Sequence, residues 1–468
     1  NQEFVENWTI GFRELAALVR DFAPSKVEQI TWVPAAKIVE AAHLIAQTRP
    51  ACLSVGNSIE LQTNGFQTIR ALAILQAITG DLDIPGGSLL VVPAKLAPFT
   101  MANPRGSAVP AIGQKEYPLF FNYAKRAQAN LFARAIIQEK PYPVKGMIVA
   151  GSNPVLTWPN ATRVREALTR LKFLAVIDQF MTETAKLADL VLPAATFLAR
   201  PELWYGAPIY GVQKIGLAPT VLSEEGQMTD WSFWNRLANK MGFGESFPWA
   251  SEEEAINFRL KPLGINIESL ERCPEGYEYE KKQAKKYEKT GFKTPSGKVE
   301  LYCRELEEHG YDPLPRYVEP YESPLSMPEL ADRYPLILTT GARRMEYFHS
   351  RYRNLPSLRR LQPEPVVEMH PALARALRIE EGEAVVVESI RGQRIALKAS
   401  LTETIDPRII SVLHGWNEAN ANCLTDDEVL DPVTGFPSYR SLLARVEKAI
   451  SIFGQPPQDT EGLSSVRS

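Results

Sequence analysis

The feature that most constrains the fold is an alternation of short apolar runs with helical segments in the middle of the chain. The runs 146–151 (GMIVAG), 172–178 (KFLAVID) and 189–193 (DLVLP) predict three strands, and a helix is predicted at 160–171 between the first two. Strands that alternate with helices in this way are typical of a doubly wound parallel sheet. We therefore expect an α/β fold in this part of the chain.

An earlier apolar run, 51–56 (ACLSVG), predicts a further buried strand, followed by a helix at 64–80 that ends at a glycine. The carboxyl ends of parallel strands open at one edge of a sheet, where ligands bind. We expect three loops to converge there on one crevice. Their residues are Gly56, Asn57, Ser58, Gly151, Ser152, Asn153 and Asp178.

Beyond Tyr334 the pattern changes to apolar and polar residues in alternation, with short glycine-containing turns. It occurs in YPLILTTG, PVVEMHP, GEAVVVESIRGQRIALKASLT and RIISVLHGW. This pattern predicts a separate, mainly β domain, either a barrel or a sandwich. We expect a helix near 439–450 (YRSLLARVEKAI) to close it.

Composition excludes several classes of protein. The formal net charge is −3 with no basic excess, which argues against nucleic-acid binding. No apolar run approaches the roughly 20 residues that a membrane span requires, and no signal peptide is visible. We expect a soluble chain, and the sequence does not decide between the cytoplasm and the periplasm.

The four cysteines, Cys52, Cys273, Cys303 and Cys423, include no C-x-x-C pair. Their spacing therefore predicts neither a disulfide framework nor a cysteine-bound metal. We expect each of them to be a small buried apolar residue.

The chain starts at Asn1 without a methionine, and a helical pattern is already present in its first 22 residues. A natural N-terminus is usually looser. We expect that a sizeable upstream segment is missing, cleaved, disordered or carried on another chain.

Five motifs, each weak by itself, occur together in one order. They are GSNPVLTWPN, VIDQFMTETAKLADLVLPAATF, TPSGKVELY, HPALARALRIEEGEAVVVES and NANCLTDDEVLDPVTGFPSYR. In this combination, and over essentially the whole chain, the sequence resembles the dimethyl sulfoxide reductase family of molybdopterin oxidoreductases.

The resemblance implies an α/β fold followed by a six-stranded double-psi-type β-barrel, and it implies domain bounds. We expect the end of one α/β domain at 1–48, a cofactor-binding α/β domain at 49–240, an irregular connection at 241–330, and a dinucleotide-binding barrel domain at 331–468.

The resemblance also implies cofactors and partners. Family members bind two molybdopterin guanine dinucleotides that chelate molybdenum or tungsten, and most carry a 4Fe-4S cluster near the N-terminus. None of the four cysteines matches the cluster motif or the metal ligand. The cluster motif and the metal ligand are therefore expected in a preceding segment or on a companion chain. An electron-transfer iron-sulfur subunit is expected as a partner. No catalytic residue and no metal ligand is assigned in these residues.

In the α/β region, Gly151, Ser152 and Asn153 would offer backbone N–H groups and a short amide to the ligand. The alternative is an ordinary left-handed turn. Asp178 would accept from guanine N1–H and N2–H2, or would serve as a helix N-cap. The resemblance assigns Gly56, Asn57 and Ser58 to the pterin.

In the β domain, the stretch TTGARRMEYFHSRYRN gathers basic residues directly after a strand. The resemblance places an arginine and a histidine here against the pterin, which points to Arg343 and His349, with Arg351 as a further candidate and Gly341 permitting close backbone approach. Guanidinium groups suit a diphosphate. The alternative is a solvated run of charges.

Near the end of the chain, the resemblance matches Asn422, Tyr439 and Arg440 to residues that contact pterin. The alternative for Arg440 is a salt bridge on a helix surface. Asp426 and Asp427 are interpreted as helix caps.

Three functional classes follow. The first is the catalytic subunit, or part of one, of a molybdenum or tungsten enzyme of anaerobic redox metabolism; a non-redox tungsten hydratase of the same family is a variant of it. The second is a nicotinamide-dependent dehydrogenase, disfavoured because no strand is followed by G-x-G-x-x-G. The third is a cofactor-binding scaffold without its own chemistry.

The stretch 56–87 is similar to the branch that includes acetylene hydratase and the thiosulfate or polysulfide reductases, but the substrate is not specified.

Overall fold

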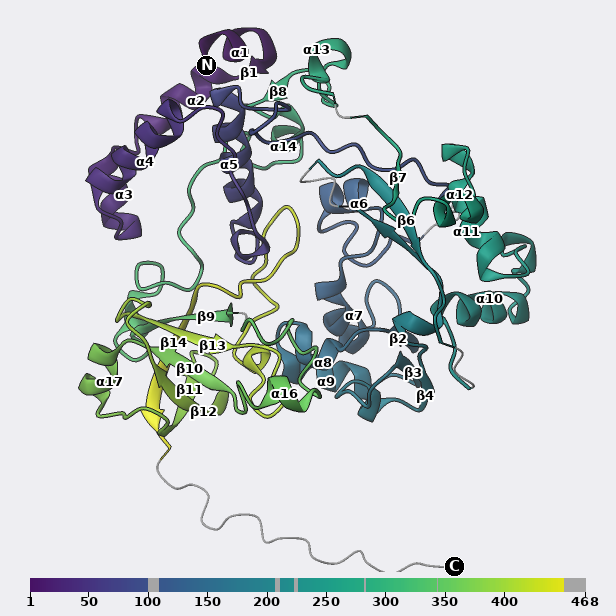
Figure 1. The fold of residues 1–468 in the computed structure, drawn as a ribbon. Coiled ribbons are helices and arrows are strands. Elements are labelled where there is room, and N and C mark those ends of the chain that lie inside the picture. Colours follow the sequence, from purple (N-terminus) through teal and green to yellow (C-terminus); the bar gives the residue numbers. More distant parts are fainter. Residues whose placement is uncertain (100–108, 207–210, 223–225, 282, 343, 450–468) are drawn as a thin grey trace, which may run out of the picture. The chain divides into compact units, whose positions relative to one another are not determined.

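A computed structural model describes residues 1–99, 109–206, 211–222, 226–281, 283–342 and 344–449 (Figure 1). The chain divides into two compact units. The first comprises Asn1–Pro154, Arg165–Val318 and Leu430–Phe436, and the second comprises Val155–Val164, Glu319–Val429 and the residues from Pro437 onward. Arg343, one of the predicted site residues, lies outside the described residues.

The first unit begins with helices. They are α1 (Gln2–Trp8), α2 (Phe12–Val19), α3 (Pro24–Thr31), α4 (Ala35–Gln47) and α5 (Gly65–Thr79). The helical pattern of the first 22 residues is interrupted by a short strand, β1 (Thr9–Ile10), which pairs with β8 (Val299–Glu300). Gly11 follows with φ 84°, and a Cβ there would lie 2.5 Å from the backbone nitrogen of Tyr302. The helix therefore breaks where the chain meets a partner distant in sequence.

The parallel sheet of the first unit confirms the central prediction. It contains β2 (Gly146–Ala150), β3 (Phe173–Asp178) and β4 (Leu190–Pro193) in that order, all parallel. The helices α8 (Pro154–Thr157) and α9 (Ala161–Thr169) connect β2 to β3. Strand β3 is buried at Leu174–Ile177 because it lies between two neighbours, which accounts for its unbroken apolar run.

The strand expected at 51–56 is wrong: these residues form no strand, and most of them are exposed. Side chains satisfy the backbone instead. The Ala51 N–H donates to Asp81, the Leu53 N–H donates to the Gln76 side chain, and Gln76 Nε2 donates to the Ala51 carbonyl. A short apolar run therefore passes along α5 without entering a sheet.

The other elements of the first unit include a second, antiparallel sheet of β5 (Glu202–Tyr205), β6 (Lys214–Ala218) and β7 (Tyr277–Glu278). The remaining helices are α6 (Pro118–Ala124), α7 (Phe132–Gln138), α10 (Asp230–Lys240), α11 (Glu252–Leu260), α12 (Ile267–Glu271), α13 (Tyr287–Thr290) and α14 (Arg304–Glu308). Within the charged stretch 273–295, Tyr287 is buried against Phe4 and Trp8.

The second unit contains a closed six-stranded barrel, as the family resemblance implied (Figure 1). Its order is β10-β12-β11-β14-β9-β13. The strands are β9 (Leu336–Ala342), β10 (Val366–Met369), β11 (Ala384–Ser389), β12 (Arg394–Leu401), β13 (Ile409–Leu413) and β14 (Leu442–Lys448). Besides most of α8 and the start of α9, the second unit includes the helices α15 (Pro328–Ala331), α16 (Pro356–Arg359) and α17 (Pro371–Leu377). Alternate residues such as Val385, Val387, Ile410 and Val412 fill the barrel core.

The helix expected at 439–450 is wrong. Residues 442–448 are strand β14, which pairs antiparallel with both β9 and β11 and so closes the barrel. Leu442, Ala444 and Val446 belong to the core cluster, a spacing of two that matches a strand. The apolar pattern of this short segment is compatible with either structure, and barrel closure selects the strand.

The cysteines also differ from expectation. All four are free; Cys52 is exposed, and Cys273, Cys303 and Cys423 are partly exposed. Cys52 lies in the segment expected to be a buried strand, which explains its exposure. In the part of the chain that the structure describes, no three His, Cys, Asp or Glu side chains gather as a metal site, and no helix has the length and apolar character to cross a membrane.

Candidate functional site

The turn after β2 has the geometry expected of Gly151. This residue has φ 57°, in the left-handed region, and its N–H donates to the Ile177 carbonyl of β3 at 2.9 Å. A Cβ at this position would meet no atom within 4 Å. The requirement for glycine is therefore conformational rather than steric. Gly151 and Ser152 are both exposed.

Asn153 connects this turn to the segment that follows β3. Its Oδ1 accepts from the N–H of Thr184 at 3.1 Å and from Thr184 Oγ1 at 2.7 Å. Thr184 is fully buried. The side-chain oxygen of Asn153 therefore orders two loops at the carboxyl edge of the sheet.

Asp178 ends β3 at the same edge. Its Oδ1 accepts from the Phe180 N–H at 3.0 Å in an Asx turn. No helix begins at this point, because the next helical turn is η3 (Ala185–Leu187), so the N-cap alternative is wrong. Within the described residues the second carboxylate oxygen of Asp178 has no hydrogen bond, which leaves one acceptor for a ligand.

Gly56, Asn57 and Ser58 are not brought to this sheet edge by a strand. They are exposed and belong to the 3-10 turn η1 (Asn57–Ile59), with Gly56 at its N-cap position. Their expected convergence with the other loops depended on a strand at 51–56, and that strand is absent. Whether these three residues contact the pterin remains a prediction from the resemblance.

In the second unit, predicted residues gather at the carboxyl ends of β9 and β13. The two strands are parallel neighbours, with Ala342 opposite Leu413, so the segments that follow them emerge side by side. Gly341 lies in β9 at this end. His414, Gly415 and Trp416 continue directly from β13.

Arg353 joins these two segments. Its guanidinium lies 4.0 Å from the Trp416 ring centroid and donates to the carbonyls of Gly415, His414 and His349. Burial lowers the pKa of Arg353 to about 10. Arg353 was not among the predicted site residues, although it belongs to the basic run that contains them.

His349 has φ 59°, and its Nδ1 lies 2.5 Å from Nε2 of His414. For a hydrogen bond between the two rings, one nitrogen must donate and the other must accept, so the tautomer of each histidine depends on the other. Arg344 and Arg353 line the same small cavity as the two histidines. Arg351 is exposed and lies over the Phe348 ring at 5.6 Å. His414 was missed by sequence reasoning, although its position directly after a strand was an available signal.

Tyr439 and Arg440 lie just before β14, next to β9. The Tyr439 carbonyl accepts from the N–H and Oγ1 of Thr340 at 2.7 and 3.0 Å. Burial raises the pKa of the Tyr439 phenol. Arg440 Nη1 lies 3.5 Å from Thr339 Oγ1. These residues enter a strand and not a helix, so Arg440 is not on a helix surface.

Asn422 is buried at 5% exposure in the 3-10 turn η8 (Ala421–Cys423). Its Nδ2 donates to the Leu156 carbonyl at 2.7 Å, and its N–H donates to Asn420 Oδ1 at 3.0 Å. Among the described residues, Asn422 Oδ1 has no hydrogen-bond partner. A buried acceptor of this kind is unfavourable unless something donates to it.

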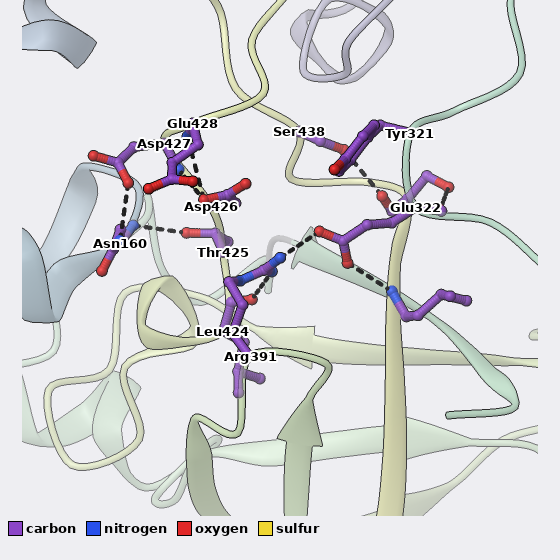
Figure 2. Close-up of polar contacts among 12 residues, drawn as sticks. Asn160, Tyr321, Glu322, Arg391, Leu424, Thr425, Asp426, Asp427, Glu428 and Ser438 are labelled. Carbon is purple, nitrogen blue, oxygen red and sulfur yellow. Dashed lines mark hydrogen bonds and ion pairs between the residues drawn. The ribbon is translucent and has the colours of Figure 1, made fainter. Parts of the chain in front are cut away.

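A cluster around Asp427 was not anticipated. Asp427 Oδ1 accepts from Asn160 Nδ2 at 2.9 Å (Figure 2). It also accepts from Arg163 Nη1 at 2.8 Å. We name Asn160, Arg163 and Asp427 the Asp427 clasp. The interpretation of Asp426 and Asp427 as helix caps is wrong, because no helix follows them; Asp426 instead accepts from the N–H groups of Asp427 and Glu428.

Comparison with protein families gives two matches. Residues 19–240 match "Molybdopterin oxidoreductase", and residues 336–443 match "Molydopterin dinucleotide binding domain". The second match covers strands β9 to β13, the loop that carries Asn422, Tyr439 and Arg440, and the first two residues of β14.

Individual relatives agree with these matches. The chain is 34% identical to acetylene hydratase of Syntrophotalea acetylenica, over 96% of this chain and 67% of the relative. It is 28% identical to the alpha subunit of a formate dehydrogenase of Methanocaldococcus jannaschii, over 96% of this chain and 66% of the relative. The solved structure of acetylene hydratase from Pelobacter acetylenicus superimposes with a TM-score of 0.87 at 32% identity, covering 96% of this chain and 68% of that one. The chain thus spans about two thirds of the length of these proteins.

Proposed function

Because the chain belongs to the dimethyl sulfoxide reductase family of molybdopterin oxidoreductases, we propose that it is the later part of a catalytic subunit that binds two molybdopterin guanine dinucleotides with molybdenum or tungsten. The observation that carries this proposal is the match of the barrel unit to a dinucleotide binding domain, together with the buried, unsatisfied oxygen of Asn422 within it.

The residues present fit the chemical groups of this cofactor. Asn422 Oδ1 needs a donor, and pterin and guanine both carry N–H groups. The open acceptor of Asp178 suits the guanine edge, and the arginines near His349 suit a diphosphate. The turn at Gly151 exposes backbone beside the sheet edge. The cofactor would supply the metal-centred chemistry, and these residues would bind and orient it.

We propose that the activity is redox chemistry, with a 4Fe-4S cluster in a further segment or companion chain and an iron-sulfur subunit as electron-transfer partner. The formate dehydrogenase relative supports an oxidoreductase. This is a proposal for the whole protein, since the metal ligand and cluster motif of the family match no residue of this chain.

A second candidate is a non-redox hydratase with tungsten. One specific observation favours it: 34% identity to an acetylene hydratase over 96% of this chain. The two candidates differ in one property. A redox enzyme requires an electron donor or acceptor for turnover, whereas a hydratase adds water to its substrate with no net electron transfer.

The test uses the full-length protein, purified without oxygen. Acid hydrolysis should release guanosine monophosphate, and elemental analysis should find molybdenum or tungsten. Protein that contains neither contradicts cofactor binding. Acetylene consumption without an added electron acceptor, compared with reduction of an artificial acceptor by formate, separates the two candidates.

Arg440 provides a more specific test of the barrel contribution. We expect Arg440→Ala to lower the guanosine monophosphate released per chain about ten- to a hundredfold, since a charge-assisted hydrogen bond contributes about 1.5 to 3 kcal/mol. Arg408→Ala is a matched control, because Arg408 is an exposed arginine paired with Asp406. Equal cofactor content in both variants and the wild type would remove Arg440 from the proposed site.

A further inference from the structure

The loop 420–428 is attached to the segment 155–164 by two sets of hydrogen bonds, and both segments belong to the second unit. In the first set, Asn420 Nδ2 donates to the Val155 carbonyl at 2.9 Å and Asn422 Nδ2 donates to the Leu156 carbonyl at 2.7 Å. Val155 and Leu156 are both buried. Two neighbouring amides thus hold two consecutive carbonyls of α8.

The contact with Leu156 decides which way the Asn422 amide faces. A carbonyl only accepts hydrogen bonds, so the nitrogen of the amide must point toward Leu156. The oxygen of Asn422 then faces elsewhere and, within the described part of the chain, is buried without a partner. Any ligand group that meets it must therefore be a donor, such as a ring N–H or an amine, and not a phosphate oxygen.

The second set is the Asp427 clasp, which fixes the start of α9. Asn160 has φ 49°, and its Oδ1 accepts from the Arg163 N–H at 3.2 Å while its own N–H donates to Thr425 Oγ1 at 3.1 Å. The Nδ2 of Asn160 donates to Asp427 Oδ1 (Figure 2), and the Arg163 guanidinium donates to the same oxygen. Thr425 Oγ1 in turn donates to the Asn422 carbonyl at 3.0 Å.

Asp427 is only 3% exposed, and its Oδ2 has no partner among the described residues. Burial raises the pKa of this carboxyl despite the contacts with Asn160 and Arg163. A buried carboxylate of this kind is a poor source of stability compared with apolar packing. Its hydrogen bonds do, however, specify one position of the segment, because they are directional.

We propose that Asp427 is a positioning residue that acts through Asn422. By holding Asn160 and Arg163 it fixes the segment 155–164, the Leu156 carbonyl then orients the Asn422 amide, and Asn422 Oδ1 accepts from an N–H donor of a heterocyclic ligand. This inference rests on the proposed function, in which the ligand is a pterin or guanine of the dinucleotide cofactor.

The test compares two variants of the full-length protein. Asp427→Asn keeps the shape of the side chain but removes the negative charge of the carboxylate that accepts from Arg163. Glu428→Gln is the matched control, since Glu428 accepts from the same guanidinium at 2.7 Å but its side chain is 65% exposed. We expect Asp427→Asn to release about tenfold less guanosine monophosphate per chain than the wild type, the scale of one charge-assisted hydrogen bond. We expect Glu428→Gln to stay within about twofold of the wild type, since exposed ion pairs contribute little.

A double-mutant cycle separates positioning from general destabilisation. If Asp427 acts through Asn422, Asn422→Ala with Asp427→Asn should release as much guanosine monophosphate as Asn422→Ala alone. The proposal would be overturned if the fold losses of guanosine monophosphate in the two single variants multiplied in the double variant. Full cofactor retention by Asp427→Asn, in a protein whose wild type contains the nucleotide, would also overturn it.

Asn160→Gly is a second variant in case Asp427→Asn does not fold, because glycine tolerates the positive φ while removing the donor to Asp427. We expect the same loss of nucleotide and faster hydrogen exchange in peptides from both 155–164 and 420–428. Unchanged exchange and nucleotide content in this variant would contradict the proposal. A wild-type protein without guanine nucleotide would instead overturn the proposed function itself.

Discussion

Gly151 shows at the scale of one residue how conformation can matter more than space. Its φ of 57° lies in the left-handed region, yet a Cβ there would meet no atom within 4 Å. The turn after β2 therefore depends on glycine for its backbone shape. Asn153 follows in the same turn, and its side-chain oxygen accepts a hydrogen bond from Thr184 Oγ1.

We expect Gly151→Ala to lower the free energy of unfolding by about 1 to 2 kcal/mol, the cost of a left-handed conformation for a residue with a Cβ. Gly56→Ala is the control, since Gly56 has φ −103° and is equally free of neighbours. It should change stability by no more than about 0.5 kcal/mol. Urea denaturation measures both. Equal effects of the two substitutions would show that strain at Gly151 is not the cause.

Between elements, Glu322 connects three parts of the second unit. Its Oε1 accepts from Arg391 Nη1 at 2.5 Å (Figure 2). Its Oε2 accepts from the Leu443 N–H at 3.1 Å. Arg391, in the turn between β11 and β12, also donates to the Leu424 carbonyl at 2.9 Å. The segment that leads into the barrel is thus attached to a hairpin turn and to β14.

Replacing Arg391 and replacing Glu322 should lower the free energy of unfolding by different amounts. Arg391→Met leaves a carboxylate at 3% exposure without its counter-charge, and we expect it to cost about 3 to 5 kcal/mol at neutral pH. Glu322→Gln leaves a neutral amide beside an arginine that is partly solvated, and we expect a cost of about 1 kcal/mol. Chemical denaturation of both variants measures the difference.

The difference should depend on pH. Burial raises the pKa of Glu322 above its usual value of 4.5, although Arg391 lowers it. As pH rises, the unfolded chain loses this proton first, so the charged carboxyl reduces stability above about pH 4.5. Without Arg391 the reduction is larger. The cost of Arg391→Met should therefore shrink when the pH is lowered to about 4, where the Glu side chain is largely protonated in both states. The cost of Glu322→Gln should change in the opposite direction and grow as the pH falls, because only the wild type gains stability when this carboxyl is protonated. A pH-independent cost of Arg391→Met would argue that packing, not charge, is lost.

Considering the whole molecule, each of the two units contains its own apolar core. Leu174 of β3 is buried in the first unit, and Leu338 of β9 lies in the barrel core of the second. Each leucine is at most 1% exposed. The cluster that contains Leu338 consists of residues of the second unit.

We expect Leu174→Ala and Leu338→Ala each to cost about 2 to 5 kcal/mol, and each to lower a different transition in differential scanning calorimetry. The physical reason is that a unit with its own core unfolds as a cooperative body. A single transition, shifted equally by both substitutions, would show that the units unfold together.

The sequence by itself determined the elements whose signal is local. The parallel strands β2, β3 and β4 and the strands of the barrel from β9 to β13 follow from apolar runs and alternation, and the ordered motifs point to the family. The tertiary structure decided what depends on distant partners. The run 51–56 lies beside α5 and forms no strand, and 442–448 becomes a strand because β9 and β11 flank it. Asp427 contacts Asn160 across 267 residues of sequence. Periodicity reports how neighbours along the chain are arranged, but pairing, burial and hydrogen-bond direction arise only when distant segments meet.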